Sequence, residues 1–476
     1  MSLPNAAALR RAIRGSLPTD PVQYDTPNRE LVYVPRRHGA ALNVSDMLVV
    51  GERGTGKSFW ARALVDPAIL ATARSFVGMD KLPAGLRVVR GWDGREDIAD
   101  GQPTRRELQQ LVVSFEPRNI WAAIYLKAVG APSVEGDTWA SRVHRIQVDP
   151  TAFSSAIRMA QLQQEKTGVF VLVLFDELDR TADDPKVRLE LLRGLLQLLL
   201  DLRATRFLRA KLFVRPDMIA TTEVRTFPDA SKVVGSPARL DWEITDLFAL
   251  AWHRLANSLG HGAIFRDFAE QSVGAAFEAG DDGYRLEESL RVDATVQRNL
   301  FHGLTGPAMG KNVKRGVPYT WLPNHLADAR GIVTVRSFLI ALAEAAQSDA
   351  HLEHPFALHW DALKDGVRKA SVRRRLEVEE DLPWAEVALG DLKDLAIPSP
   401  RETIFERWTE RDTVEVVRTK ERAPALESGK EKACLYKALA DAGVFGERSD
   451  GRLNVPDVYR VAYGLPLRGG VSTRRR

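Results

Sequence analysis

The feature that most constrains the fold is a glycine-rich loop between an apolar segment and a helical one. The loop reads GERGTGKS and spans residues 51–58. The apolar segment 46–50 predicts a short buried strand, and SFWARALVD, which begins within the loop, predicts a helix. A strand, a loop with this glycine spacing and a helix form a cradle of backbone N–H groups that suits phosphate.

Each residue type in this loop has a physical role. Gly51 and Gly56 leave room for an anion and permit positive φ. Lys57 supplies a mobile charge for the β- and γ-phosphates, and Ser58 supplies a hydroxyl ligand for Mg²⁺. We therefore predict that ATP and Mg²⁺ bind here. The expected nucleotide-binding residues of the loop are Gly51, Glu52, Arg53, Gly54, Thr55, Gly56, Lys57, Ser58 and Phe59.

A second apolar run ends in two acidic residues. VFVLVLF at 169–175 has the continuous apolar character of a central parallel strand. Asp176 follows it and can hold Mg²⁺, usually through water, while Glu177 can orient or deprotonate the attacking water. Asp179 and Arg180 are expected to begin the next loop or to cap its helix. The acidic pair therefore predicts ATP hydrolysis, with Glu177 and Lys57 as catalytic residues.

Two arginines are further candidates at this site. Arg215 ends the apolar segment AKLFV, which we place beside the Asp176 strand, where it could contact the γ-phosphate or the lytic water. Arg336 opens the helical segment TVRSFLIALAEAA and could reach the phosphates from a lid. Each has the alternative of an ordinary surface arginine. The side chains of Phe59 and Trp60 are expected to pack on the core and not to stack on a base.

The alternation of strands and helices predicts an α/β fold with a parallel sheet. Further strands are expected at 85–92 and 210–214, and helices at 150–166 and 187–206. Four parts are predicted along the chain: an irregular lead-in at 1–45, a P-loop ATPase core at 46–225, a helical lid at 226–350 and a winged-helix-like basic domain at 351–476.

The segments GERGTGKS, LVLFDELDR and KLFVRPD, in this order, resemble the AAA+/STAND superclass of ASCE P-loop ATPases, including KAP-like and origin-recognition-type proteins. The resemblance implies that Arg215 is a sensor residue, that Arg336 is the sensor 2 arginine of the lid, and that a winged helix follows. It also implies an ATP-driven switch that acts on assembly or on a nucleic-acid or defence process. The chain departs from the pattern in two places, because no arginine finger is evident after Val214 and no G-x-x-R surrounds Arg336.

The sequence lacks the motifs that identify other classes of P-loop protein. A GTPase would show N-K-x-D, an ABC ATPase would show an LSGGQ-like signature, and a helicase would add S-A-T or Q-x-x-G-R-x-x-R, and none of these occurs. No spacing typical of zinc ligands and no nuclease motif is evident. These absences favour an ATPase whose effector chemistry, if any, lies on another chain.

Basic residues gather toward the C-terminus. The segment KDGVRKASVRRR at 364–375 has six Lys or Arg against one Asp, and the tail RGGVSTRRR has four Arg. In a winged helix, Asp450-Gly451 would form the wing tip between Arg448 and Arg452. DNA or RNA is therefore a candidate partner. The alternatives are a solvated basic face, a homo-oligomer contact or a partner protein, and a DNA-binding adaptor with little turnover is the second functional hypothesis.

The composition of the chain indicates the cellular compartment. The apolar share of 45% and the charged share of 27% suit a globular protein, and no run approaches the length of a membrane span. Cys434 is the single cysteine, which fits a reducing cytoplasm, and the first residues do not read as a signal peptide. We expect a cytoplasmic protein without a membrane partner.

Overall fold

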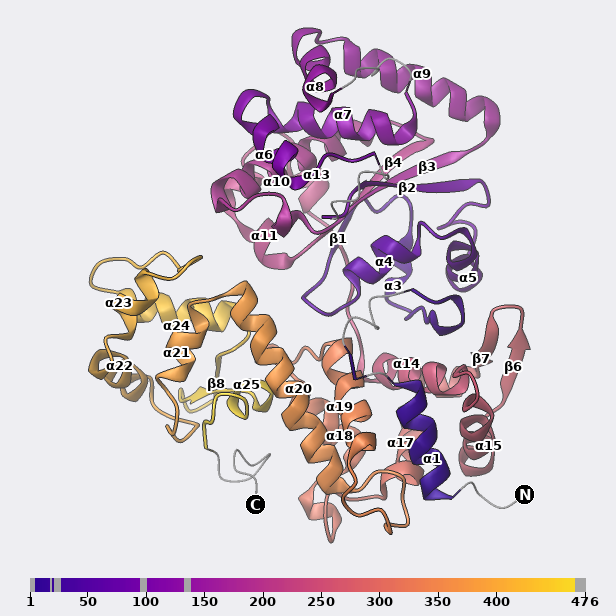
Figure 1. Ribbon diagram of the computed structural model, residues 1–476, viewed down its shortest axis with the longest axis vertical. Coiled ribbons are helices and arrows are strands. Elements are labelled where there is room, and N and C mark those ends of the chain that lie inside the picture. The colour runs from indigo at the N-terminus through magenta and orange to yellow at the C-terminus, as the bar shows by residue number, and fades with distance from the viewer. Residues whose placement is uncertain (1–4, 18, 21–26, 95–100, 132–137, 467–476) are drawn as a thin grey trace. The chain divides into compact units, whose positions relative to one another are not determined.

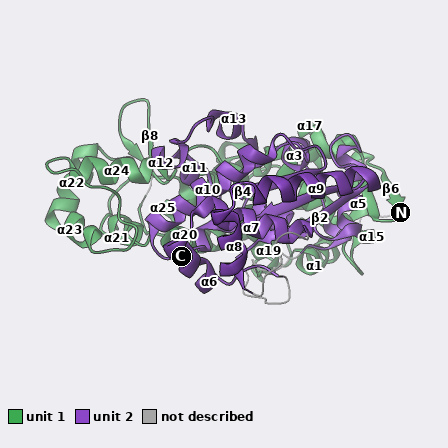
Figure 2. Cartoon of the chain, turned by 90° about the horizontal axis from the view of Figure 1, so that it is seen from above, with its two compact units in different colours: residues 1–24, 242–476 green, residues 25–241 purple. Residues whose placement is uncertain are grey.

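The computed structural model describes residues 5–17, 19–20, 27–94, 101–131 and 138–466. The chain divides into two compact units, which have separate colours in Figure 2. Unit 2 is Asp25–Asp241, and unit 1 combines Met1–Tyr24 with Trp242–Arg476. Unit 2 is therefore inserted into unit 1 in the order of the sequence, and each unit is described by itself below.

Unit 2 is built on a five-stranded sheet in which every pair of neighbours is parallel. The strand order is β2-β3-β4-β1-β5. The strands are β1 (Leu48–Val50), β2 (Leu86–Trp92), β3 (Phe170–Phe175), β4 (Leu208–Val214) and β5 (Ala238–Arg239). Because β4 pairs with β3, the predicted neighbour of the Asp176 strand is confirmed, as is the α/β fold class.

Helices cover both faces of this sheet (Figure 1). Along β3, Val171, Val173 and Phe175 enter one buried apolar cluster, whereas Leu172 and Leu174 enter the other. The strand therefore has no polar side, as expected for a central parallel strand. The helices on the face of Val171 include α6 (Arg105–Ser114), α7 (Pro117–Val129), α8 (Trp139–Val148), α9 (Ala152–Thr167) and α10 (Pro185–Leu202). Those on the other face include α3 (His38–Leu42), α4 (Lys57–Ala63) and α5 (Pro67–Val77).

Short helical turns complete unit 2. They are the 3₁₀ turns η1 (Arg29–Leu31) and η4 (Leu178–Arg180) and the helices α11 (Pro216–Ala220), α12 (Thr222–Arg225) and α13 (Ser231–Val234). The turns η4 and α11 begin directly beyond the ends of β3 and β4. They therefore lie at the carboxyl edge of the sheet, where ligands of such folds bind.

Unit 1 begins with a helical part. Its helices are α1 (Ala6–Ser16), α14 (Ile244–Ala256), α15 (Gly262–Val273), α16 (Glu288–Val292), α17 (Ala294–Thr305), α18 (Pro318–Leu326), α19 (Val335–Gln347) and α20 (Trp360–Asp381), with the turn η5 (Val313–Arg315) and the hairpin β6 (Phe277–Gly280)–β7 (Gly283–Leu286). The ring of Phe248 contacts those of Trp252, Phe301, Tyr319 and Phe338, which joins four of these helices in an aromatic core.

The C-terminal part of unit 1 has its own apolar cluster, drawn from residues 378–465. It contains α21 (Ala385–Gly390), α22 (Arg401–Glu410), α23 (Thr413–Arg418), α24 (Glu431–Asp441), the hairpin β8 (Gly446–Glu447)–β9 (Leu453–Asn454) and α25 (Asp457–Arg460). Ser399 bridges Leu453 in the antiparallel sense, so a third extended segment lies beside β9. The predicted turn at Asp450-Gly451 closes the hairpin, with Gly451 at a φ of 80°.

The predicted boundaries differ from the two units. The lead-in 1–45 is not irregular throughout, because α1 packs on α14, α15 and α19 of unit 1, while α3 belongs to unit 2. The core does not end at 225, because β5 adds to the sheet beside β1. The boundary at 350 falls within unit 1. Among the helices that the structure describes, none has the length and apolar character that crossing a bilayer requires.

Candidate nucleotide site

The loop that follows β1 has the backbone shape that its glycines permit. Gly54 and Gly56 have φ values of 78° and 102°, which favour glycine. A Cβ on Gly51 would lie 2.5 Å from Thr55 Oγ1, so a larger residue would displace the loop. Thr55 Oγ1 in turn donates a hydrogen bond to the carbonyl of Glu52 at 2.8 Å. The loop is therefore a compact cradle that ends where α4 begins.

Lys57 lies inside this cradle. Its Nζ donates hydrogen bonds of 2.9 Å to the carbonyls of Gly51 and Glu52. Burial lowers the pKa of Lys57, and the nearby carboxylate of Asp176 opposes that effect. The ammonium thus sits within the loop, where an incoming anion would meet it.

Asp176 and Ser58 meet across two elements. Asp176 comes directly after β3, is 3% exposed, and donates its backbone N–H to the carbonyl of Trp92 at 2.8 Å. The hydroxyl of Ser58, on α4, is close enough to the Asp176 carboxylate to favour its ionised form. Burial raises the pKa of Asp176, and the Ser58 hydroxyl and the charge of Lys57 act in the opposite direction. A hydroxyl and a carboxylate oxygen side by side are the donor set that suits Mg²⁺.

Glu177 is held by two arginines. Arg62 of α4 pairs with its Oε1 at 3.1 Å, and Arg180 pairs with its Oε2 at 2.8 Å. The backbone of Glu177 has a φ of 54°, which is uncommon for a residue other than glycine. Burial and the charge of Asp176 raise the pKa of Glu177 to about 7, although both arginines oppose the rise. The side chain can therefore gain or lose a proton near neutral pH.

Arg215 lies at the same edge of the sheet. It follows β4 and forms hydrogen bonds of 3.1 and 2.8 Å with the carboxylate of Asp217. Its charge lowers the pKa of Lys57, so the guanidinium is close enough to act on the ammonium. Its strand lies beside the Asp176 strand as predicted, and its contact with the γ-phosphate stays a prediction.

Arg336 lies in the other unit. It is the second residue of α19, and its Nη1 pairs with Glu377 Oε1 of α20 at 2.7 Å. Glu377 also accepts a 2.9 Å ion pair from the buried Arg374. Arg336 is thus part of a charge network within unit 1, and its role as a sensor stays a prediction.

The aromatic residues after the loop pack as predicted. Trp60 is 1% exposed, and its Nε1 donates a 3.1 Å hydrogen bond to His38 Nδ1. Phe59 contacts the ring of Trp60 edge-on at 5.3 Å and packs against the apolar cluster on that face of the sheet.

Arg62 and Arg180 both contact the candidate base, although the sequence pattern indicated neither of them as a site residue. Arg62 is separated from Glu177 by 115 positions, so no spacing rule could pair them. Arg180 lies in the 3₁₀ turn η4 after β3, and its side chain reaches back to Glu177. Both residues control the charge around the candidate base.

Most cations of the basic segment on α20 have intramolecular partners, and its role as a nucleic-acid surface stays a prediction. Lys364, Arg368 and Lys369 pair with Asp361, Asp365 and Glu344. Arg374 is buried and pairs with Glu377, and Arg375 pairs with Glu379 at 2.6 Å. Five of the six cations of the segment therefore lie beside a carboxylate of this chain. The predicted basic tail at 468–476 lies outside the described residues.

Comparisons with known proteins give similarity in structure only. No protein-family model and no curated protein matches the sequence. The chain is similar to the ORC1 protein of Aeropyrum pernix, solved in complex with DNA, at 15% identity and a TM-score of 0.36 over 90% of this chain and 91% of that one. It is also similar to Cdc6p of Pyrobaculum aerophilum (12%, 0.33, 92% and 94%) and to the ORC2 protein of Aeropyrum pernix in its ADPNP-ADP complexes (14%, 0.33, 90% and 94%). At such values the fold assignment rests on the chain's own sheet and loop.

Proposed function

We propose that this chain binds MgATP and hydrolyses it, and that it acts as a nucleotide-dependent switch of the AAA+/STAND type. The observation that supports the proposal most is that Ser58 and Lys57 of the phosphate loop both act on the Asp176 carboxylate, because this brings the loop and the acidic strand together. Lys57 is close enough to Asp176 for each charge to act on the other. The candidate phosphate, metal and base groups therefore gather at one edge of one sheet.

Each group has a distinct role in this proposal. The loop amides and Lys57 bind the phosphates, and Ser58 and Asp176 hold Mg²⁺, which neutralises charge on the phosphates when it is bound. Glu177 orients and deprotonates the attacking water. Arg215 responds to the γ-phosphate.

The two arginines on Glu177 add a condition to catalysis. Each oxygen of the Glu177 carboxylate faces one cation, Arg62 or Arg180. To take a proton from water, one oxygen must also accept a hydrogen bond from that water. We propose that nucleotide binding shifts these arginine contacts and admits the water, so that hydrolysis begins only in the loaded site.

The hydrolysis proposal is tested with Glu177→Gln. The variant keeps the size of the side chain but removes the base. It is therefore expected to bind ATP normally, while its steady-state ATPase rate is expected to fall at least 100-fold. The matched control is Glu165→Gln on the exposed face of α9, which is expected to keep the wild-type rate. If Glu177→Gln hydrolyses ATP as fast as the wild type, Glu177 is not the base.

The alternative is an adaptor whose ATP site controls assembly with little turnover. Wild type and Glu177→Gln would then both show little ATP hydrolysis, while a slowly hydrolysed ATP analogue would change the oligomer size. Mass photometry with ADP and with the analogue separates the two functions. A chain that hydrolyses ATP without any change of size would support the enzyme and not the switch.

A nucleic-acid partner is the finer part of the proposal. The C-terminal part of unit 1 has the order helix, extended segment, helices and hairpin that a winged helix has, with Ser399 beside β9. Arg452 pairs with Asp450 at 2.7 Å, whereas Arg448 is exposed on the same turn. Arg448 is therefore the wing cation available to a phosphate backbone.

Arg448→Ala tests this surface. In fluorescence anisotropy with duplex DNA, it is expected to weaken binding and to reduce the slope of log affinity against log salt by about 1. Arg452→Ala, which removes a cation already paired with Asp450, is the control and is expected to change the slope less. Equal slopes for Arg448→Ala and the wild type would exclude the wing as a phosphate contact.

A further inference from the structure

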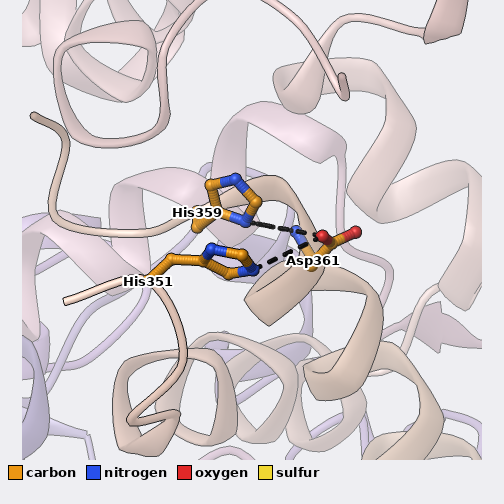
Figure 3. Close-up of side chains that lie close together, drawn as sticks. All are labelled: His351, His359 and Asp361. Carbon is orange, nitrogen blue, oxygen red and sulfur yellow. Dashed lines mark hydrogen bonds and ion pairs between the residues drawn. The ribbon is translucent and has the colours of Figure 1, made fainter. Parts of the chain in front are cut away.

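Three histidines lie within nine residues in the segment that joins α19 to α20. The segment reads HLEHPFALHWD from residue 351 to residue 361, and the whole chain has nine histidines. Two of them, His351 and His359, converge with Asp361 (Figure 3). The expectation that the chain has no zinc-ligand spacing overlooked this segment, because it contains no cysteine pair.

The three side chains converge but lie slightly farther apart than the ligands of a bound metal ion. His351 Nε2 lies 3.6 Å from Asp361 Oδ2, and His359 Nδ1 lies 3.8 Å from the same oxygen. One ligand atom from each residue lies within 4.8 Å of the other two. In a tetrahedral site with bonds of about 2.0–2.2 Å, ligand atoms are separated by roughly 3.3–3.6 Å. The cluster must therefore contract for all three atoms to reach coordination distance.

Two features keep the imidazoles in place. His359 is 4% exposed and stands between the ring of His351, at a centroid distance of 3.8 Å, and the ring of Trp360, at 3.7 Å. His351 has a φ of 61°, a left-handed backbone conformation that is uncommon for this residue type. Strained backbone of this kind is often found where a side chain must be aimed at a ligand.

We propose that His351, His359 and Asp361 form a binding site for a divalent transition-metal ion, with Zn²⁺ as the expected occupant. Two imidazoles and one carboxylate are ligands that Zn²⁺ accepts readily. Three protein ligands leave one position for water, and the exposure of His351 and Asp361 opens the site to solvent. The softness of imidazole disfavours Mg²⁺, so this site is chemically distinct from the oxygen-donor pair in unit 2.

Metal binding must compete with contacts that the cluster already makes. His359 caps α20, because its Nδ1 accepts a 3.2 Å hydrogen bond from the backbone N–H of Asp361. Lys364 pairs with the other oxygen of Asp361 at 3.1 Å. A capping hydrogen bond contributes much less than a structural metal.

The site would fasten the connection between two long helices. Residues 348–359 link α19 to α20, and these helices pack along each other. Arg10 of α1 also binds this connection, through a 2.8 Å hydrogen bond to the carbonyl of Ala357. A metal that joins His351 to the first turn of α20 would therefore fix the connection at a second place.

The test measures Zn²⁺ bound to the full chain with any affinity tag removed. The protein is stripped with a chelator, loaded with Zn²⁺ in millimolar Mg²⁺, passed over gel filtration and assayed for metal content. About one Zn²⁺ per chain is expected. His351→Ala and His359→Asn are expected to weaken binding at least 10-fold in competition with a chelating dye. Asn is chosen at 359 because it is also a good helix cap. His144→Ala, an exposed histidine on α8, is the control and should bind as the wild type does.

Cobalt supplies an independent signature. Co²⁺ in place of Zn²⁺ is expected to give the intense visible absorption of a tetrahedral site in the wild type and to lose it in both cluster variants, with circular dichroism showing that the variants stay folded. The proposal is overturned if the wild type retains no Zn²⁺ through gel filtration. It is also overturned if His351→Ala and His359→Asn, both folded, bind Zn²⁺ as tightly as the wild type.

Discussion

A buried lysine in the sheet of unit 2 makes the stability of that unit depend on pH. Lys211 lies within β4 and is 0% exposed. Its Nζ donates a 2.9 Å hydrogen bond to the carbonyl of Asn43 and another to that of Asp46. Burial lowers its pKa from the ordinary 10.5 to about 7, and the charge of Asp46 opposes the fall.

The direction in which the free energy of unfolding changes with pH follows from the number of protons that each state binds. Between pH 7 and pH 10.5 the unfolded chain holds the proton on Lys211 and the folded chain increasingly does not. The unfolded state therefore binds more protons, and the free energy of unfolding rises with pH across this window. Below pH 7 both states are protonated, and the full cost of burying the charge applies. With the pKa values above, the rise from pH 7 to pH 9 is about 2 kcal/mol for this one group.

Lys211→Met isolates this contribution. Methionine has a similar length and no charge, so the variant should lack the pH-dependent rise. Denaturant unfolding of the full chain at pH 7, 8 and 9, with hydrogen exchange of β3 and β4 peptides to identify the transition of unit 2, gives the free energies. The difference between wild type and Lys211→Met should move by about 2 kcal/mol in favour of the wild type from pH 7 to pH 9.

The variant also loses two hydrogen bonds to the carbonyls of Asn43 and Asp46, and this loss changes its free energy of unfolding by the same amount at every pH. It therefore does not affect the comparison across pH. Lys166→Met, an exposed lysine at the end of α9, is the control and should run parallel to the wild type. If the curves of Lys211→Met and the wild type are also parallel from pH 7 to pH 9, the lysine is charged in the folded chain and the reasoning is refuted.

Two further predictions concern the paired arginines. Arg62→Ala should lower kcat/KM for ATP about tenfold at pH 7 and less at pH 9, because the Arg62 charge favours the ionised form of Glu177; a loss that is equal at both pH values would mean that Arg62 acts in another way. Glu377→Gln should lower the free energy of unfolding by about 3 kcal/mol, because it leaves the buried Arg374 and the partly buried Arg336 without their anion. Urea unfolding followed by circular dichroism checks the second, and a change below about 1 kcal/mol would contradict it.

The sequence predicts the nucleotide unit well because its signals are local. The loop at 51–58 needs glycines for its backbone, and the strand at 169–175 is buried on both faces, so each shows in consecutive residues. The strand β5 was missed because it has two residues, too few for any periodicity. Its place beside β1 depends on pairing across nearly the whole unit.

Contacts between distant positions account for the other misses. The pairs of Glu177 with Arg62 and of Glu377 with Arg336 join different elements, and composition alone made the cations look free. The basic segment at 364–375 shows the same error, because its partners include Glu344 of another helix. A count of charges along the chain says nothing about which of them are already neutralised.

The insertion of unit 2 within unit 1 has a consequence for synthesis on the ribosome. Helix α1 is translated before unit 2, yet the helices on which it packs, α14, α15 and α19, all follow residue 241. At 5–20 residues per second, about 10–40 s pass while unit 2 emerges. During that interval the nascent nucleotide domain can fold as one continuous segment, while α1 must wait without its partners. Unit 1 can therefore finish folding only after unit 2 has been synthesised.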